Sequence, residues 1–271
     1  MLLSLIMTFF VISANGVKIS HGKSKHKDVE KMYKKWLKDY KSPNPKHQDY
    51  CANILATKSG SSSQYSQDLF IFFNFFKYWP MEHRTGFYID SGTNDAIQLS
   101  NTYFFDVCLG WSGLCIEPEI QYHASIRENR TCHLIPECVS DVNQKVGIIH
   151  AGVLSSITSQ PGDTKCSTLS DMLARVNKNT NIAPNHTVDF WSLDVEGYEM
   201  TVLRSVNFEQ IHFRVLLVEE FWQVTRSLDR LLNERGYNKY HQLPIDAVYT
   251  HRSVHTPVHP WYEATYEETW K

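Results

Sequence analysis

The sequence predicts an α/β protein with a mostly parallel sheet that is covered by helices on both faces. From about residue 66 to residue 250, short runs of aromatic and β-branched residues alternate with amphipathic stretches of helical spacing. Two of the runs end on a carboxylate, at Asp90 and Glu117, and a turn of small residues follows the first. Such alternation is typical of parallel strands joined by crossover helices.

The stretch from 86 to 118, GFYIDSGTNDAIQLSNTYFFDVCLGWSGLCIEP, has the plan of a mononucleotide-binding βαβ unit. The strand, helix and second strand expected in it occupy residues 87–89, 100–109 and 114–116. Gly92 suits a sharp turn at which a ligand approaches the main chain, and the Glu117 carboxylate can accept hydrogen bonds from two ribose hydroxyls. No lysine follows the turn, which disfavours a Walker-type nucleotide site. Taken alone, the segment also fits an ordinary strand-to-helix turn.

The rest of the chain supplies further elements in alternation. Helices are expected at 121–129, from Thr168, and at 228–235; strands at 134–139, 188–193, 215–218, 237–243 and 246–250; and a hairpin at 145–158. An aromatic stripe predicts a helix that ends at Pro80 and covers the sheet, with Leu69, Phe72, Phe73 and Phe76 on its apolar face.

Four motifs carry a resemblance to a known family. They are IDSGTNDA, SNTYFFDVCLGWSGLCIEP, VSD at 139–141 and SLDVEGYEMTVLRSVNF at 192–208. In this order they resemble the FkbM family of S-adenosylmethionine-dependent methyltransferases. The resemblance implies a Rossmann-like class I methyltransferase fold with a seven-stranded sheet, in which S-adenosyl-L-methionine lies across the carboxyl ends of the central strands. The sequence departs from the family pattern at Ser91, Thr93 and Ala96.

The resemblance also implies site residues. The expected cofactor contacts, with Ser140 and Asp141 on the adenine side, are Asp90, Gly92, Asn94, Asn101, Glu117, Ser140 and Asp141. Methyl transfer to oxygen requires a group that removes the proton of the acceptor, and two carboxylates after the strand at 188–193, Asp194 and Glu196, are the first candidates. Glu219 and Glu220 are the second pair. Asp194 could instead cap the next helix.

The expected function is an O-methyltransferase of the secretory pathway that acts on a hydroxyl, with glycans as the acceptor class. The alternative is a secreted protein that keeps the fold, has lost catalysis and serves as a binding module. A nucleotide-dependent oxidoreductase is disfavoured because the full glycine fingerprint is absent from the sequence.

The chain divides into a signal peptide at 1–16, a basic helical stem and linker at 17–64, a methyltransferase-like domain at 65–250 and a carboxyl-terminal tail at 251–271. The apolar run at 2–12 is too short to span a bilayer, so a cleavable secretory signal is favoured over an uncleaved anchor or a buried helix. Glycosylation sequons begin at Asn129 and Asn185, where we expect loops. Together these features predict secretion or residence in the lumen of the endoplasmic reticulum or Golgi, without a stable membrane span.

Charge is distributed unevenly. Residues 18–46 contain ten lysines and three acids, a net charge of +7, so the remainder carries −9 in a chain of net charge −2. An acidic catalytic region argues against a nucleic-acid substrate. The basic stretch has helical spacing and ends at Pro43 and Pro45. A solvated helix packed by its apolar stripe is favoured over a surface for anionic glycans or membranes.

Six cysteines in a secreted chain suggest disulfides, with the pairing left open. Cys115 lies in an apolar strand, where a free buried thiol is also reasonable. No C-x-x-C pair is present, which disfavours zinc bound by cysteine. His251, His255 and His259 have helical spacing, but prolines interrupt the segment, so no metal site is predicted.

Overall fold

The computed structural model describes residues 22–149, 156–158, 161–180, 187–220 and 225–254. The helices are α1 (Gly22–Lys38), η1 (Pro45–His47), α2 (Gln48–Thr57), α3 (Gln67–Ile71), η2 (Phe72–Phe76), η3 (Pro80–Glu82), α4 (Tyr103–Leu109), α5 (Ile120–Asn129), α6 (Leu169–Thr180), α7 (Glu199–Ser205) and α8 (Thr225–Glu234). The strands are β1 (Phe87–Ser91), β2 (Ser112–Ile116), β3 (His133–Ile135), β4 (Cys138–Val139), β5 (Gln144–Ile149), β6 (Ser156–Thr158), β7 (Thr164–Ser167), β8 (Thr187–Leu193), β9 (His212–Glu219), β10 (Tyr237–Gln242) and β11 (Asp246–His251).

The main sheet has seven strands in the order β10-β11-β9-β8-β1-β2-β3. The pairs that join β3, β2, β1, β8 and β9 are parallel, and β11 runs antiparallel to both of its neighbours. The expected mostly parallel, seven-stranded sheet is therefore confirmed. The strand order reverses between β1 and β8, and ligands of open α/β sheets bind beside such a reversal at the carboxyl ends of the strands.

Helices cover both faces of this sheet because its strands bury alternate side chains on opposite sides. In β1, Tyr88 belongs to the core beneath α2, α3, η2 and α4. Phe87 and Ile89 belong to a second core, which packs against α6, α7 and α8. Each face thus has its own apolar layer, and the main sheet is buried between them.

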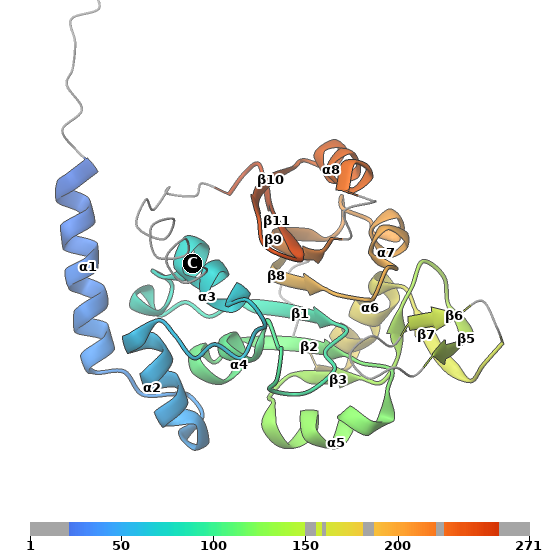
Figure 1. The fold of residues 1–271 in the computed structure, drawn as a ribbon, viewed down its shortest axis with the longest axis horizontal. Helices are drawn as coiled ribbons and strands as arrows, with labels where there is room; N and C mark the ends of the chain where they lie inside the picture. Colours follow the sequence, from blue (N-terminus) through green and yellow to red (C-terminus); the bar gives the residue numbers. More distant parts are fainter. Residues whose placement is uncertain (1–21, 150–155, 159–160, 181–186, 221–224, 255–271) are drawn as a thin grey trace, which may run out of the picture.

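A smaller four-stranded sheet, in the order β4-β7-β5-β6, lies on the side toward which β1 and β8 point (Figure 1). The strand expected at 134–139 is wrong as a single element, because it is divided between β3 of the main sheet and β4 of the small one. Pro136 lies between the two pieces and has no N–H to donate to a ladder. The hairpin expected at 145–158 is confirmed by the antiparallel pairing of β5 with β6.

All six cysteines are paired in this structure, as Cys51–Cys108, Cys115–Cys132 and Cys138–Cys166. The alternative interpretation of Cys115 as a free buried thiol is therefore wrong. The first bridge ties α2 to α4, the second ties β2 to the segment before β3, and the third joins β4 to β7 within the small sheet. Each bridge links segments that are neighbours only in the folded chain.

The basic helix α1 docks on the domain through its aromatic side chains. Tyr33 is 2% exposed and donates a hydrogen bond to the Leu55 carbonyl, and Trp36 packs against the same core, as does Tyr40 just after the helix. This arrangement supports the packed, solvated helix that the sequence favours. The expected aromatic helix before β1 is also present, as α3 followed by η2, and both are buried.

Several expectations fall outside the described residues: the signal peptide, the Asn185 sequon, and His255 with His259. The helix expected from residue 100 begins three residues later, at Tyr103. Asn129 is the last residue of α5 instead of a loop residue. Among the described residues, no helix is both long enough and apolar enough to cross a membrane.

Candidate active site

The turn after β1 can be made only by a glycine. Gly92 has a φ of +81°, and a Cβ on it would lie 1.8 Å from the main-chain oxygen of Asp194. The Asp194 N–H in turn donates to the Ser91 carbonyl at 3.0 Å, which extends the pairing of β1 and β8 to the end of both strands. The sequence correctly required glycine here, and the close approach comes from the neighbouring strand.

Glu117 closes onto this turn from the end of β2. Its Oε2 accepts a hydrogen bond from the Asn94 N–H at 2.6 Å, and its Oε1 accepts one from the Glu119 N–H at 2.7 Å. Burial is the main cause that raises the pKa of Glu117 to about 7. The two N–H groups act to lower this pKa, and the charges of Glu119 and Asp90 act to raise it. The turn after Asp90 and the Glu117 carboxylate therefore lie at one rim of the sheet, as the sequence predicts.

Three carboxylates meet beside the turn: Asp194, Glu196 and Glu219. One oxygen of each lies within 4.8 Å of the others. The register explains the meeting, because Leu193 pairs with Val218 across β8 and β9, so the next residues of both strands are neighbours. The interpretation of Asp194 as a helix cap is not supported, since α7 has no side-chain cap and Glu199 accepts hydrogen bonds from the N–H groups of Val195 and Gly197.

Burial and mutual repulsion favour the protonated forms of these acids. Burial, and then the charges of Glu219 and Glu196, raise the pKa of Asp194 well above its usual value. Burial and the charges of Glu196 and Glu199 raise the pKa of Glu219 to about 8. Burial and the charge of Glu199 raise the pKa of Glu196 to about 6. The cluster can therefore take up and release a proton near neutral pH.

A cavity of about 260 Å³ joins the Gly92 turn, Glu117 and the carboxylate cluster. The small sheet closes one side of it through Val139 and Ile148. The described residues that line it include no lysine or arginine, and they include five acids: Glu117, Glu119, Asp194, Glu196 and Glu219. A cavity with this lining attracts cations and repels anionic ligands.

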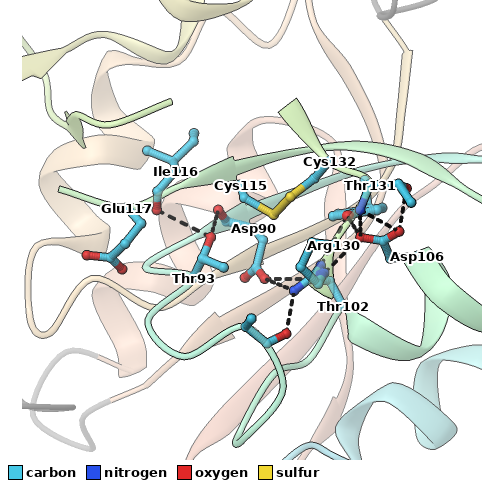
Figure 2. The surroundings of a disulfide bond; sticks show 12 residues. Asp90, Thr93, Thr102, Asp106, Cys115, Ile116, Glu117, Arg130, Thr131 and Cys132 are labelled. Carbon is cyan, nitrogen blue, oxygen red and sulfur yellow. Dashed lines mark hydrogen bonds and ion pairs between the residues drawn. A yellow bond between two sulfur atoms is a disulfide. The ribbon is translucent and has the colours of Figure 1, made fainter. Parts of the chain in front are cut away.

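Asp90 lies behind the turn and not in the cavity wall. It is 4% exposed, accepts a hydrogen bond from the Thr102 hydroxyl at 2.5 Å, and forms an ion pair with Arg130 at 3.7 Å. Figure 2 shows Arg130 between Asp90 and Asp106, beside the Cys115–Cys132 bridge, with Glu117 directed away from it. Asp90 thus supports the turn from within the protein.

The other predicted cofactor residues divide into two groups. Gly92, Asn94, Asn101 and Glu117 line the cavity. Ser140 and Asp141 do not: Ser140 is buried, with its N–H bonded to the Ser167 carbonyl, and Asp141 is exposed. Their immediate predecessor in the chain, Val139, does line the cavity. A role for this pair in binding adenine stays a prediction.

Sequence reasoning missed two residues of the site and ranked a third too low. Gln67 lines the cavity from α3 and donates to Asp246 at 2.8 Å, and the charge of Asp246 contributes to the raised pKa of Asp194. Glu219 was only a second candidate, yet it completes the carboxylate cluster. Glu220, the other residue of the second candidate pair, instead forms an ion pair with Lys239 at 3.0 Å. No short motif distinguishes these residues, because sheet order brings them together.

The three departures from the family pattern fit the fold. Ser91 accepts a hydrogen bond from the indole N–H of Trp191 at 2.9 Å, and Thr93 donates to the Asp90 carbonyl at 3.1 Å. Ala96 is buried, and its carbonyl accepts from Arg130 at 3.3 Å. Thr93 lines the cavity, whereas Ser91 and Ala96 are buried and are not among its lining residues.

Stability should fall as pH rises through the range in which the cluster ionises. The folded-state pKa of Glu219 is raised to about 8 from an ordinary value of 4.5, so the folded protein binds more protons than the unfolded chain between these values. Urea unfolding of the apo protein measures this effect. Between about pH 5 and pH 9, we expect the free energy of unfolding to fall by about 1 to 3 kcal/mol less in Glu219→Gln than in the wild type.

The surface variant Glu234→Gln at the end of α8 controls for the loss of one charge. A wild-type profile that Glu219→Gln leaves unchanged would contradict the assignment of this carboxylate as a buried proton acceptor.

Strand order, strand direction and the position of the cavity define a Rossmann-like class I methyltransferase fold. The family model described as the methyltransferase FkbM domain matches residues 90–239, more than half of the chain, and the protein belongs to this family. This confirms the resemblance and identifies a methyltransferase domain.

Solved structures that match include precorrin-6y C5,15-methyltransferase from Geobacter metallireducens GS-15, at 12% identity and a TM-score of 0.35, over 61% of this chain and 81% of that one. A candidate RNA methyltransferase from Pyrococcus horikoshii matches at 12% identity and a TM-score of 0.36, over 69% of this chain and 82% of that one. At this similarity neither indicates a substrate. No curated protein matches the sequence.

Proposed function

We propose that the protein is an S-adenosyl-L-methionine-dependent O-methyltransferase of the secretory pathway that methylates a hydroxyl of a glycan. The observation that carries this proposal is the meeting of Glu117, the Gly92 turn and the carboxylate cluster in one cavity at the carboxyl ends of β1, β2 and β8. A donor site and a proton acceptor are thereby side by side.

The residues present fit the donor. Glu117 can accept hydrogen bonds from ribose hydroxyls, and the buried Oδ1 atom of Asn94 has no hydrogen-bond partner in the described structure. Asn94 lines the cavity, so this oxygen can accept from an N–H or O–H group of a ligand. The acidic lining also favours a sulfonium cation over an anionic nucleotide.

When bound, the donor supplies an electrophilic methyl group. Asp194, assisted by Glu196 and Glu219, orients the acceptor hydroxyl and takes its proton as the new C–O bond forms. With the donor bound, transfer of its methyl group would leave a neutral thioether and a methyl ether, and the Asp194 carboxyl group would hold the proton removed from the hydroxyl. The pKa of Glu196 is raised to about 6 and that of Glu219 to about 8, so the cluster as a whole can accept a proton near neutral pH.

Two properties of the chain support the compartment and the acceptor class. The three disulfides are typical of proteins that fold in an oxidising compartment, where glycans are abundant. A cavity lined by five acids and no lysine or arginine among its described residues favours an uncharged hydroxyl acceptor over phosphorylated or sulfated ones. Neutral glycans meet both conditions.

Glu117→Ala should weaken donor binding by at least about tenfold, because it removes a charged acceptor for two ribose hydroxyls. Calorimetric titration with S-adenosyl-L-methionine in the presence of a chelator measures this directly. Glu128→Ala, on the exposed face of α5, is the matched control and should bind as the wild type does.

Equal affinity in both variants would refute the ribose assignment. If the wild type does not bind at millimolar donor, the second function is favoured, a binding module that keeps the fold without catalysis. If it binds, mass spectrometry of a neutral glycan mixture incubated with labelled donor should reveal a gain of one methyl group.

A further inference from the structure

We propose that Asp194, Glu196 and Glu219, together with the amide oxygen of Asn101, form a binding site for one divalent cation of the magnesium or manganese class. The sequence predicted no metal site, because its candidate ligands were cysteines and histidines. The site inferred here consists of oxygen atoms at the ends of β8 and β9 and in the loop before α4.

The three carboxylates have the spacing of ligands around one ion. One oxygen of each lies within 4.8 Å of the others. Oxygens that bind magnesium at about 2.1 Å are separated by at most about 4.2 Å, so only a small adjustment is needed for all three to reach the same ion. Glu219 is the last residue of β9, and Asp194 and Glu196 follow the end of the adjacent parallel strand β8, whose register places Asp194 beside Glu219.

Asn101 provides an independent indication of a ligand. Asn101 is 7% exposed, and its Nδ2 donates to the Ser192 hydroxyl at 3.1 Å, while its Oδ1 has no hydrogen-bond partner among the described residues. Ser192 and Asp194 are two residues apart on an extended chain, so their side chains lie on the same face. The amide is therefore anchored on the Asp194 side of β8, and it lines the same cavity with a vacant carbonyl acceptor.

The charge of the cavity points in the same direction. None of the described lining residues is a lysine or arginine that could neutralise the cluster. The carboxylates of Asp194 and Glu219 are both half-buried. Holding two negative charges together there costs free energy unless a cation or a shared proton offsets them. No N–H or O–H group donates to the buried Oε2 of Glu219 in the described structure.

The donor set selects the class of cation. Carboxylate and amide oxygens are hard ligands, which magnesium, manganese and calcium prefer, and no described histidine or cysteine lines the site with a free ligand atom. Four protein oxygens leave coordination positions toward the cavity. In the proposed reaction, such a position would hold the acceptor oxygen and ease the loss of its proton. This role rests on the proposed function, whereas cation binding does not.

The test is a manganese titration of the purified full chain, stripped with a chelator and kept free of methyl donor. Electron paramagnetic resonance, which measures free Mn²⁺, should reveal one saturable site. Glu219→Gln and Asp194→Asn should each weaken Mn²⁺ affinity by more than about tenfold, and Asn101→Leu by about tenfold. Magnesium should compete for the site. Glu234→Gln, at the surface end of α8, should leave affinity unchanged.

Absence of a saturable site at millimolar Mn²⁺ overturns the proposal, and so does equal affinity in the wild type and in Glu219→Gln. Circular dichroism and thermal melts establish that each variant is folded. The donor titration in chelator is a separate measurement, so loss of donor binding with retained Mn²⁺ binding refutes only the methyltransferase function, and the converse refutes only the cation site.

Discussion

Asp194→Asn is expected to lower the rate of methyl transfer by about 10²- to 10⁴-fold, the contribution of a positioned general base. Asparagine has nearly the same shape and cannot take a proton. Asp194 lines the cavity beside Glu219, and its main-chain N–H donates to the Ser91 carbonyl, just before the Gly92 turn. Initial rates measure the effect, with labelled donor and the glycan that mass spectrometry identifies as the acceptor.

The same variant should keep donor affinity within about threefold, because the proposed ribose contacts come from Glu117, which follows the end of a different strand, β2. Asp163→Asn, a fully exposed carboxylate outside the cavity, serves as the matched control and should retain the wild-type rate. An Asp194→Asn enzyme with an undiminished rate would exclude this carboxylate both as the base and as an essential ligand.

Arg130→Met is expected to reduce the free energy of unfolding by about 3 to 5 kcal/mol, which is the usual cost of leaving buried charges without their partner. The Arg130 side chain is fully buried and pairs with Asp106 at 2.8 Å and with Asp90 at 3.7 Å. It also donates to the Thr102 hydroxyl at 2.6 Å and to the Ser100 hydroxyl at 3.2 Å. Methionine fills similar volume but leaves both carboxylates unpaired.

Arg127→Met is the matched control, since Arg127 is an exposed residue of α5, three residues before Arg130, which caps the end of this helix. Urea unfolding at neutral pH should separate the two variants by at least about 2 kcal/mol. Adding Asp106→Asn to Arg130→Met should restore part of the loss, because removal of both partners costs less than removal of one. Equal stability of the two methionine variants would show that the buried ion pairs contribute little.

Much of the fold follows from patterns that are local in the chain. The runs that end on Asp90, Glu117, Asp194 and Glu219 are strands in the structure, and each ends within one residue of that acid. Alternation of strands and helices then requires a parallel sheet. The division of 134–139 between two sheets could not be predicted, because the residues on both sides of Pro136 suit a strand and only packing determines which sheet each joins.

The sequence predicted several residues of the candidate site, but it did not predict how all of them come together. Glu117 and Gly92 were assigned to one rim, and they are bridged through the Asn94 N–H. Arg130 could not be recognised, because in the sequence it is the middle residue of a glycosylation sequon at the end of a helix. Its partners Asp106 and Asp90 are 24 and 40 residues earlier in the chain.

The amino-acid sequence by itself determined the alternating α/β architecture, the sharp turn at Gly92 and the presence of acids at strand ends, since each depends on neighbours in the chain. The tertiary structure alone decided which cysteines pair, which acids share a cavity and which charge is neutralised by Arg130. These outcomes depend on the order and register of strands, which are set by packing between segments far apart in the sequence.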